Sequence, residues 1–166
     1  MRVEYINPFV EAAFSILKEV LSMTGGEIVN VKRGDLYLKS SSMSIMGVAA
    51  LVGLAGDVEG RVLFDMSKAT ALFVASCMND GEEFTAIDEM VKATITELAN
   101  MITAQAVTKL HDLGFKFDLT PPALFTGENM EISNNLEVEA LIVPMELGPD
   151  GINGKIEINV VIRERS

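Results

Sequence analysis

The chain has 166 residues, of which 49% are hydrophobic and 22% are charged, and its formal charge is −11. These values predict one domain over residues 1–166, because the length suffices for a sizeable core and the hydrophobic content excludes disorder. The acidic excess argues against a nucleic-acid partner, since binding to phosphates needs clustered Lys and Arg. Cys77 is the single cysteine and cannot form an internal disulfide, which fits a reducing, cytoplasmic location.

No segment has the pattern of a membrane anchor. Residues 1–14 contain an acid at position 4 and no long apolar run, so they do not have the pattern of a signal peptide. The longest stretch without charge, Ser40 to Gly56, is rich in Ser and Gly and is shorter than the ~20 apolar residues that cross a bilayer. We therefore expect this stretch to be a buried strand and the protein to have no membrane partner.

The N-terminal part predicts a helix followed by short strands. Asn7 followed by Pro8 has the pattern of a helix start, and the apolar spacing after it predicts a helix over about residues 8–23, which Gly25-Gly26 would end. The alternation in Glu27–Arg33 and Asp35–Lys39 predicts two half-buried strands that are broken at Gly34.

A hairpin and a second helix are expected next. The apolar segments Met43–Leu54 and Val58–Met66 predict two antiparallel strands that turn at residues 55–57. The first of these strands is almost wholly apolar, which favours a central place in a sheet. Ser67 is placed to cap a helix with the sequence KATALFVASCM, in which Cys77 is expected to be a small packing residue.

The longest predicted helix covers Thr85 to Leu113 and organises the rest of the chain. Its apolar side chains recur at about 100° per residue on one stripe, and these are Ile87, Val91, Ile95, Leu98 and Ile102. Thr85 with Asp88 resembles a capping box, and Gly114 is placed to end the helix.

Two polar residues fall opposite the apolar stripe of this helix. Glu97 and Asn100 are three residues apart and are therefore neighbours on the helix surface. The residues expected around them are small or hydroxylated, namely Ala93, Thr96, Thr103 and Ala104. Because these neighbouring side chains are short, the backbone of a partner could come close to the two polar side chains.

The C-terminal part predicts strands again, and it repeats a pattern from the first half. Residues Ala123–Thr126, Leu136–Glu146 and Ile152–Arg163 are expected to be extended. Segments 58–64 and 152–158 share the form aliphatic-x-Gly-basic-aliphatic-x-apolar. We therefore expect an α+β fold of duplicated helix-plus-hairpin units, in which a mostly antiparallel sheet is covered by helices.

The residues available for chemistry exclude most kinds of site. His111 is the only histidine and lies near the end of the long helix. We expect it to interact with the helix dipole and not to act as a catalyst. The chain lacks HExxH, CxxC, EF-hand and P-loop patterns, so no metal ligand and no cofactor of its own are expected. The pair Glu97-x-x-Asn100 remains, although taken alone this pattern is equally that of a solvated helix face.

Four segments together resemble the CheC/CheX/FliY family of chemotaxis phosphatases, and most closely its CheX-type members. They are a helix that opens Asn-Pro-Phe, the hairpin GLAGDVEGRVLFDMS, the segment ELANMITAQA with Glu97 and Asn100, and PPALFTG at 121–127. The family often has Ser or Asp four residues before the Glu, where this chain has Ala93. The family proline falls on Pro121 or Pro122. When Glu11 is aligned with Glu97, Phe14 takes the position of Asn100, which favours the type with one site.

The resemblance implies a protein phosphatase that acts on the aspartyl phosphate of a CheY-type response regulator, with Glu97 and Asn100 as catalytic residues. Asn100 would orient the attacking water, and Glu97 would pair with a regulator Lys, while Mg²⁺ would be supplied in the regulator's own site. The resemblance also suggests a homodimer. A non-catalytic adaptor of the same fold and a structural homodimer formed by strand addition are the alternatives.

Overall fold

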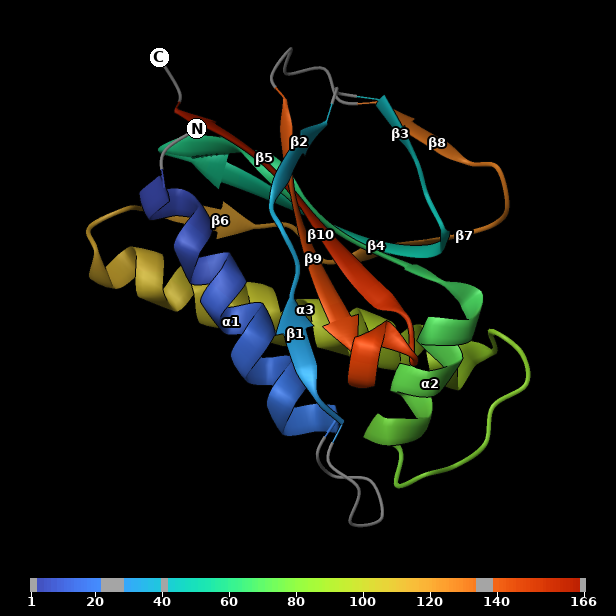
Figure 1. Ribbon diagram of the computed structural model, residues 1–166. Helices are drawn as coiled ribbons and strands as arrows, with labels where there is room; N and C mark the ends of the chain where they lie inside the picture. The colour runs from blue at the N-terminus through green and yellow to red at the C-terminus, as the bar shows by residue number, and fades with distance from the viewer. Residues whose placement is uncertain (1–2, 22–28, 40–41, 134–138, 165–166) are drawn as a thin grey trace.

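The computed structural model describes residues 3–21, 29–39, 42–133 and 139–164 (Figure 1). Its helices are α1 (Val3–Leu21), α2 (Lys68–Met78) and α3 (Glu89–Asp112), with a 3₁₀ turn, η1, at Pro149–Gly151. The strands are β1 (Val31–Arg33), β2 (Tyr37–Lys39), β3 (Ser42–Ser44), β4 (Gly47–Gly56), β5 (Val58–Ser67), β6 (Phe117–Leu119), β7 (Ala123–Thr126), β8 (Glu131–Ser133), β9 (Ala140–Leu147) and β10 (Lys155–Glu164).

Eight strands form one sheet in the order β1-β9-β10-β5-β4-β6, in which β2 also pairs with β9 and β7 also pairs with β4. Strands β3 and β8 form a separate two-stranded ribbon. Every pairing among the described strands is antiparallel, which confirms the expected α+β fold with a mostly antiparallel sheet.

The strand order also supports the expected duplication. The two hairpins, β4–β5 and β9–β10, meet through β5 and β10 at the centre of the sheet. The short strands after α1 pair with the hairpin of the second half, and the short strands after α3 pair with the hairpin of the first half. The spacing that relates Glu11 to Glu97 also relates Tyr37, which begins β2, to Ala123, which begins β7. The two halves are therefore related by an approximate two-fold axis.

Close packing explains the glycine in each repeated segment. A Cβ atom on Gly60 would lie 1.9 Å from the carbonyl oxygen of Val161 on the neighbouring strand. Gly154 has a φ of +95°, and a Cβ atom there would lie 2.0 Å from Oγ1 of Thr70. Both positions therefore exclude any side chain.

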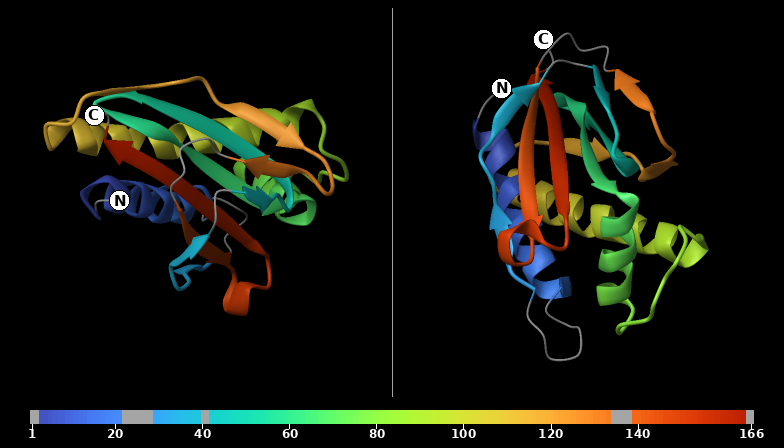
Figure 2. Two further views of the ribbon diagram at one scale, coloured as in Figure 1. Left: turned by 90° about the horizontal axis from the view of Figure 1, so that it is seen from above. Right: turned by 45° about the vertical axis from the view of Figure 1, so that its right-hand side comes forward.

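Helices α1 and α3 pack against each other on one face of the sheet (Figure 2). Val62 and Phe64 of β5 and Ile158 of β10 belong to the same buried cluster as the helices. The opposite face has a smaller apolar cluster of Ile45, Ala49 and Leu63, which packs against partly buried residues that include Ile132 of β8. The sheet thus has helices on one face and part of the β3–β8 ribbon on the other.

Several predicted boundaries were wrong. Strand β10 begins at Lys155 and not at Ile152, because η1 and the turn after it occupy residues 149–154. Helix α1 begins at Val3, with Pro8 inside it, because Tyr5 and Ile6 are buried and this packing favours an earlier turn. Helix α3 begins after Asp88, whose carboxylate accepts the Val91 N–H at 2.9 Å, so Thr85 is not the cap. The segment 43–54 divides into β3 and β4 at Ile45-Met46.

Strand β4 is an interior strand of the sheet, as predicted, because it pairs with β5 on one edge and with β6 and β7 on the other. It lies next to the central pair β5–β10, and it is almost wholly apolar because both of its faces are covered, one by α3 and the other by the cluster of Ile45, Ala49 and Leu63. The Ser67 cap of α2 is confirmed, since its hydroxyl accepts the Thr70 N–H at 3.1 Å. Gly114 ends α3 with a φ of +96°, as predicted. The predicted stop at Gly25-Gly26 lies outside the described residues.

The helix-free face of the central strands carries a buried polar cluster. Asp65 of β5 and Glu157 of β10 are directly opposite each other, and both are buried. One Asp65 oxygen accepts the Met46 N–H at 2.9 Å, whereas the other is buried without a hydrogen-bond partner among the described residues. Tyr37 donates a hydrogen bond to Glu157, and its pKa is raised to about 12 by burial and by that carboxylate.

Burial raises the pKa of Asp65 to about 6, and the facing carboxylate of Glu157 adds to this effect. The Met46 N–H and the ammonium group of Lys39 act in the opposite direction but do not compensate. Lys155 lies 3.8 Å from Glu157, and Arg61 of β5 donates to Asn159 at 3.1 Å. Near neutral pH, Asp65 is therefore a charged group in a site that favours its neutral form.

We expect Asp65→Asn to stabilise the protein above about pH 6, because the amide keeps an acceptor for Met46 and removes the buried charge. A pKa raised from 3.8 means that the folded state loses stability as pH rises through about 6. A shift of this size corresponds to about 2–3 kcal/mol at most. Urea unfolding of both proteins from pH 4 to pH 8 should therefore give a difference that is small at pH 4 and grows with pH. A pH-independent difference would contradict this assignment.

Candidate functional site

Helix α3 fixes the orientation of the predicted site. Val91, Ile95, Leu98 and Ile102 are each at most 1% exposed and join the helix to the main core. The apolar stripe is therefore confirmed, except that Ile87 precedes the helix and packs against the core from the preceding segment. With this stripe buried, the rotation of α3 about its axis is fixed, and so is the direction of the residues between the buried positions.

Glu97 and Asn100 both lie on the exposed side of α3. They are one turn apart on a continuous helix and flank the buried Leu98 and Ala99. In the part of the chain that the structure describes, neither side chain has a hydrogen bond or an ion pair. A carboxylate and an amide are thus presented side by side to the outside on a rigid element.

The residues that border this pair have short side chains, as predicted, but one of the predicted neighbours is buried. Ala93 and Ala104 are exposed, and Thr96 is partly exposed with its hydroxyl donated to the carbonyl of Lys92 at 2.8 Å. Thr103 is fully buried, because its position is turned toward the core and its hydroxyl donates to the Ala99 carbonyl at 2.8 Å. The small residues that border the pair are therefore Ala93, Thr96 and Ala104.

A hollow of about 410 Å³ adjoins Glu97. We call it the α3–β7 hollow, and it is lined by Glu89, Lys92, Ala93, Thr96, Glu97, Leu124 and Thr126. Its second wall is held in place because β7 pairs with β4, with Thr126 opposite Val48 and Leu124 opposite Ala50. Lys92, Leu124 and Thr126 were not predicted as neighbours of the site, since no local sequence pattern brings β7 beside α3.

The corresponding positions of the first half do not form a second pair of this kind. Glu11 is exposed on α1, but its carboxylate forms an ion pair with Lys109 of α3. Phe14, at the position that corresponds to Asn100, is 37% exposed, with the ammonium group of Lys18 at 5.3 Å from its ring centroid. The first half thus keeps a carboxylate in an ion pair and lacks the amide.

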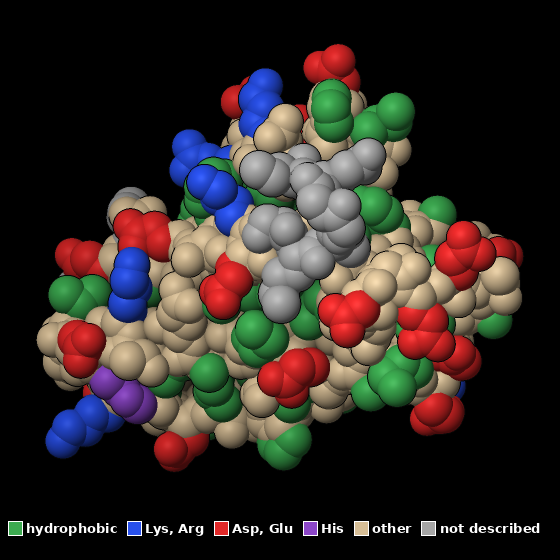
Figure 3. Space-filling model, turned by 90° about the horizontal axis from the view of Figure 1, so that it is seen from below, with side chains coloured by type: hydrophobic (Ala, Val, Ile, Leu, Met, Phe, Trp, Pro, Cys, Tyr) green, Lys and Arg blue, Asp and Glu red, His purple; other side chains and the backbone are tan. Residues whose placement is uncertain are grey.

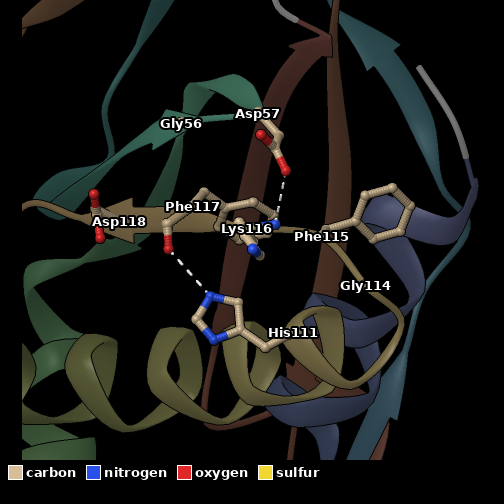
Figure 4. Close-up of a pocket in the computed structure, with 8 residues that line it drawn as sticks. All are labelled: Gly56, Asp57, His111, Gly114, Phe115, Lys116, Phe117 and Asp118. Carbon is tan, nitrogen blue, oxygen red and sulfur yellow. Dashed lines mark hydrogen bonds between the residues drawn. The ribbon is translucent and has the colours of Figure 1, made fainter.

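His111 lies in a second hollow, of about 540 Å³, at the other end of α3 (Figure 4). Its Nε2 atom is 3.2 Å from the carbonyl oxygen of Phe117. Asp57 accepts the Lys116 N–H at 3.0 Å and donates its own N–H to the Lys116 carbonyl. These contacts hold the β4–β5 turn against the segment after α3, which is a structural role for these polar groups.

The remaining ionisable groups among the described residues suggest no metal site. Among the described residues, no group of three or more His, Cys, Asp and Glu could hold a metal ion. Cys77 is buried in α2, in agreement with its predicted packing role. No helix of the described chain is both long and apolar enough to cross a membrane.

Acidic side chains are spread across the face seen from below, and several basic ones gather toward one side (Figure 3).

Residues 48–146 match the family model of the chemotaxis phosphatase CheX, which covers more than half of the chain. The chain belongs to this family. A curated relative, the CheY-P phosphatase CheX of Thermotoga maritima, is 28% identical over 134 residues, which are 81% of this chain and 83% of that protein.

Two solved structures are similar over nearly their whole length. A CheX–CheY–BeF₃–Mg²⁺ complex from Borrelia burgdorferi contains a chain that is 49% identical, with a TM-score of 0.81 and coverage of 98% of this chain and 100% of that chain. A CheC-like superfamily protein from Shewanella sp. PV-4 is 28% identical, with a TM-score of 0.82 and coverage of 98% and 99%. The resemblance drawn from four sequence segments is therefore confirmed at the level of family and fold.

Proposed function

We propose that this protein, as a single domain over residues 1–166, accelerates hydrolysis of the aspartyl phosphate of a CheY-type response regulator in chemotaxis. The observation that carries the proposal is the exposed, unpaired Glu97 and Asn100 on the buried scaffold of α3. Membership of a phosphatase family and the 49% identical relative solved with CheY support the same partner. A reducing cytoplasm suits both the single cysteine and this partner.

The proposed chemistry needs little from the protein. An aspartyl phosphate is an acyl phosphate that hydrolyses unaided, and phosphoryl transfer depends mainly on positioning and electrostatics. A hundredfold acceleration requires a barrier lower by only about 2.7 kcal/mol. Orientation of one water molecule can provide an effect of this size.

Each side chain has a separate role in this proposal. The Asn100 amide enters the regulator's site and holds a water molecule in line with phosphorus, since an amide both donates and accepts hydrogen bonds but is no base at neutral pH. Glu97 pairs with a regulator Lys and thereby fixes the depth of insertion. Mg²⁺ would be supplied in the regulator's own site, and the relative from Borrelia burgdorferi was solved in a complex that contains CheY, BeF₃ and Mg²⁺.

A phosphate-release assay tests this function directly. A CheY-type regulator from the same organism is phosphorylated with a small-molecule donor, the donor is removed, and phosphate release is followed with and without this protein. We expect a shorter phosphate lifetime at substoichiometric amounts of the protein. An unchanged lifetime with every such regulator of the organism would exclude the phosphatase function.

A further inference from the structure

The proposed complex must extend beyond Glu97 and Asn100. A specific protein–protein interface buries about 800 Å² on each partner, which is many times the surface of two side chains. Because both residues lie on a straight helix, a regulator placed on them also covers the neighbouring residues of α3. This inference rests on the proposed function and asks which neighbouring surface receives the regulator.

The α3–β7 hollow adjoins the proposed catalytic pair at Glu97, which is part of its wall. Ala93 leaves the space open at the level of the exposed helix surface, and Leu124 adds an apolar side chain from β7. The hydroxyl of Thr126 and the charged groups of Glu89 and Lys92 provide polar groups around it. This combination of apolar and polar groups suits a short regulator side chain next to a polar one better than it suits an extended apolar segment.

Among the described residues, Lys92 is the one basic residue that lines this hollow. Its side chain is 42% exposed and lies 3.5 Å from Glu89, whose side chain is 94% exposed. An ion pair this exposed contributes little, so Lys92 can exchange it for another acidic partner. Acidic groups around the regulator's phosphorylated aspartate approach a protein whose formal charge is −11, and like charges repel. A cation beside Glu97 reduces the resulting repulsion.

We propose that the α3–β7 hollow is a docking subsite for the phosphorylated regulator. In this subsite, Ala93 leaves room for a regulator side chain, and Lys92 pairs with an acidic group close to the phosphorylated aspartate. Lys92 is then a positioning residue, because it acts on the placement of the regulator and does not touch the reacting water. Substitutions there should change KM and leave kcat unchanged.

Ala93→Phe tests the space in the hollow, with Ala69→Phe as the matched control at an exposed position of α2. We expect Ala93→Phe to raise KM by about tenfold or more with kcat within about twofold, whereas the control keeps both values. Affinity for the regulator treated with beryllium fluoride and Mg²⁺ should fall by the same factor. Equal circular dichroism and unfolding midpoints establish that the variants are folded.

Lys92→Ala tests the charge, with Lys68→Ala as a control that removes the same charge from α2. We expect a several-fold higher KM for Lys92→Ala at low salt and a smaller difference at 0.5 M salt, since screening weakens exposed charge pairs. Lys92→Arg should retain most of the affinity.

Failure of the subsite and failure of the phosphatase function give different results. A wild-type protein that releases phosphate, together with unchanged KM values for Ala93→Phe and Lys92→Ala, would overturn the subsite alone. A wild-type protein without activity would overturn the proposed function, and binding of the beryllium fluoride form to both variants would still decide whether the hollow is used. A loss of kcat without a change in KM would also contradict the docking role.

Discussion

Asn100→Ala is expected to remove nearly all acceleration of phosphate release, which is a loss of about a hundredfold, while affinity for the regulator changes little. The variant lacks the amide that would orient water, but it keeps Glu97 and the surrounding surface of α3 unchanged. Alanine also favours the helix more than asparagine does, so the structural scaffold should not weaken. Phosphate release at saturating variant concentration measures the expected loss.

Binding must be measured separately, because a lower rate alone would not distinguish loss of chemistry from loss of contact. Affinity for the regulator with beryllium fluoride and Mg²⁺ serves this purpose. Asn7→Ala is the matched control, since Asn7 is an exposed asparagine on α1. Undiminished turnover by Asn100→Ala would defeat the proposed role of the amide. A wild-type protein that binds but does not hydrolyse would instead favour the adaptor function.

Asn100→Gln tests the position of the amide, whereas Asn100→Ala tests its presence. Glutamine keeps both hydrogen-bonding groups but places them one methylene further from the helix. A misplacement of about 1 Å can cost as much as a hundredfold when catalysis depends on orientation. We therefore expect the rate of phosphate release with Asn100→Gln to be closer to that of Asn100→Ala than to that of the wild type. Full activity of the glutamine variant would indicate that the amide does not position the water.

The orientation of the site could be predicted from the sequence because α3 has a regular apolar stripe over many turns. Once the stripe is buried, Glu97 and Asn100 must be exposed, and the structure confirms both. Thr103 was assigned to the wrong side because its hydroxyl can bond to the carbonyl one turn earlier, which allows a threonine to be buried inside a helix.

The features that depend on long-range packing could not be predicted in this way. The α3–β7 hollow needs β7 beside α3, and Asp65 becomes buried only through strands that are distant in sequence. The start of α1 was missed for a related reason, since burial of Tyr5 extends the helix beyond the local start signal Asn7-Pro8. The start of α3 was missed for a local reason, because Asp88 caps the helix in place of Thr85.

Glu97→Ala is expected to lower kcat/KM by more than a hundredfold, since it affects both binding and the placement of Asn100. Without the carboxylate, the regulator Lys in the complex has lost its partner, and a desolvated charge left unpaired typically costs several kcal/mol. The measured result should be weaker affinity for the beryllium fluoride form together with slower release at saturation.

The charge and the shape of Glu97 can be separated. Glu97→Gln keeps the length of the side chain and a hydrogen-bond acceptor, whereas Glu97→Lys places two cations opposite each other. We therefore expect affinity to fall in the order wild type, Gln, Lys. The control is Asp35→Ala, which removes one exposed negative charge between β1 and β2. If all Glu97 variants lose no more affinity than this control, the carboxylate acts only through the overall charge and the proposed pairing with a regulator Lys is wrong.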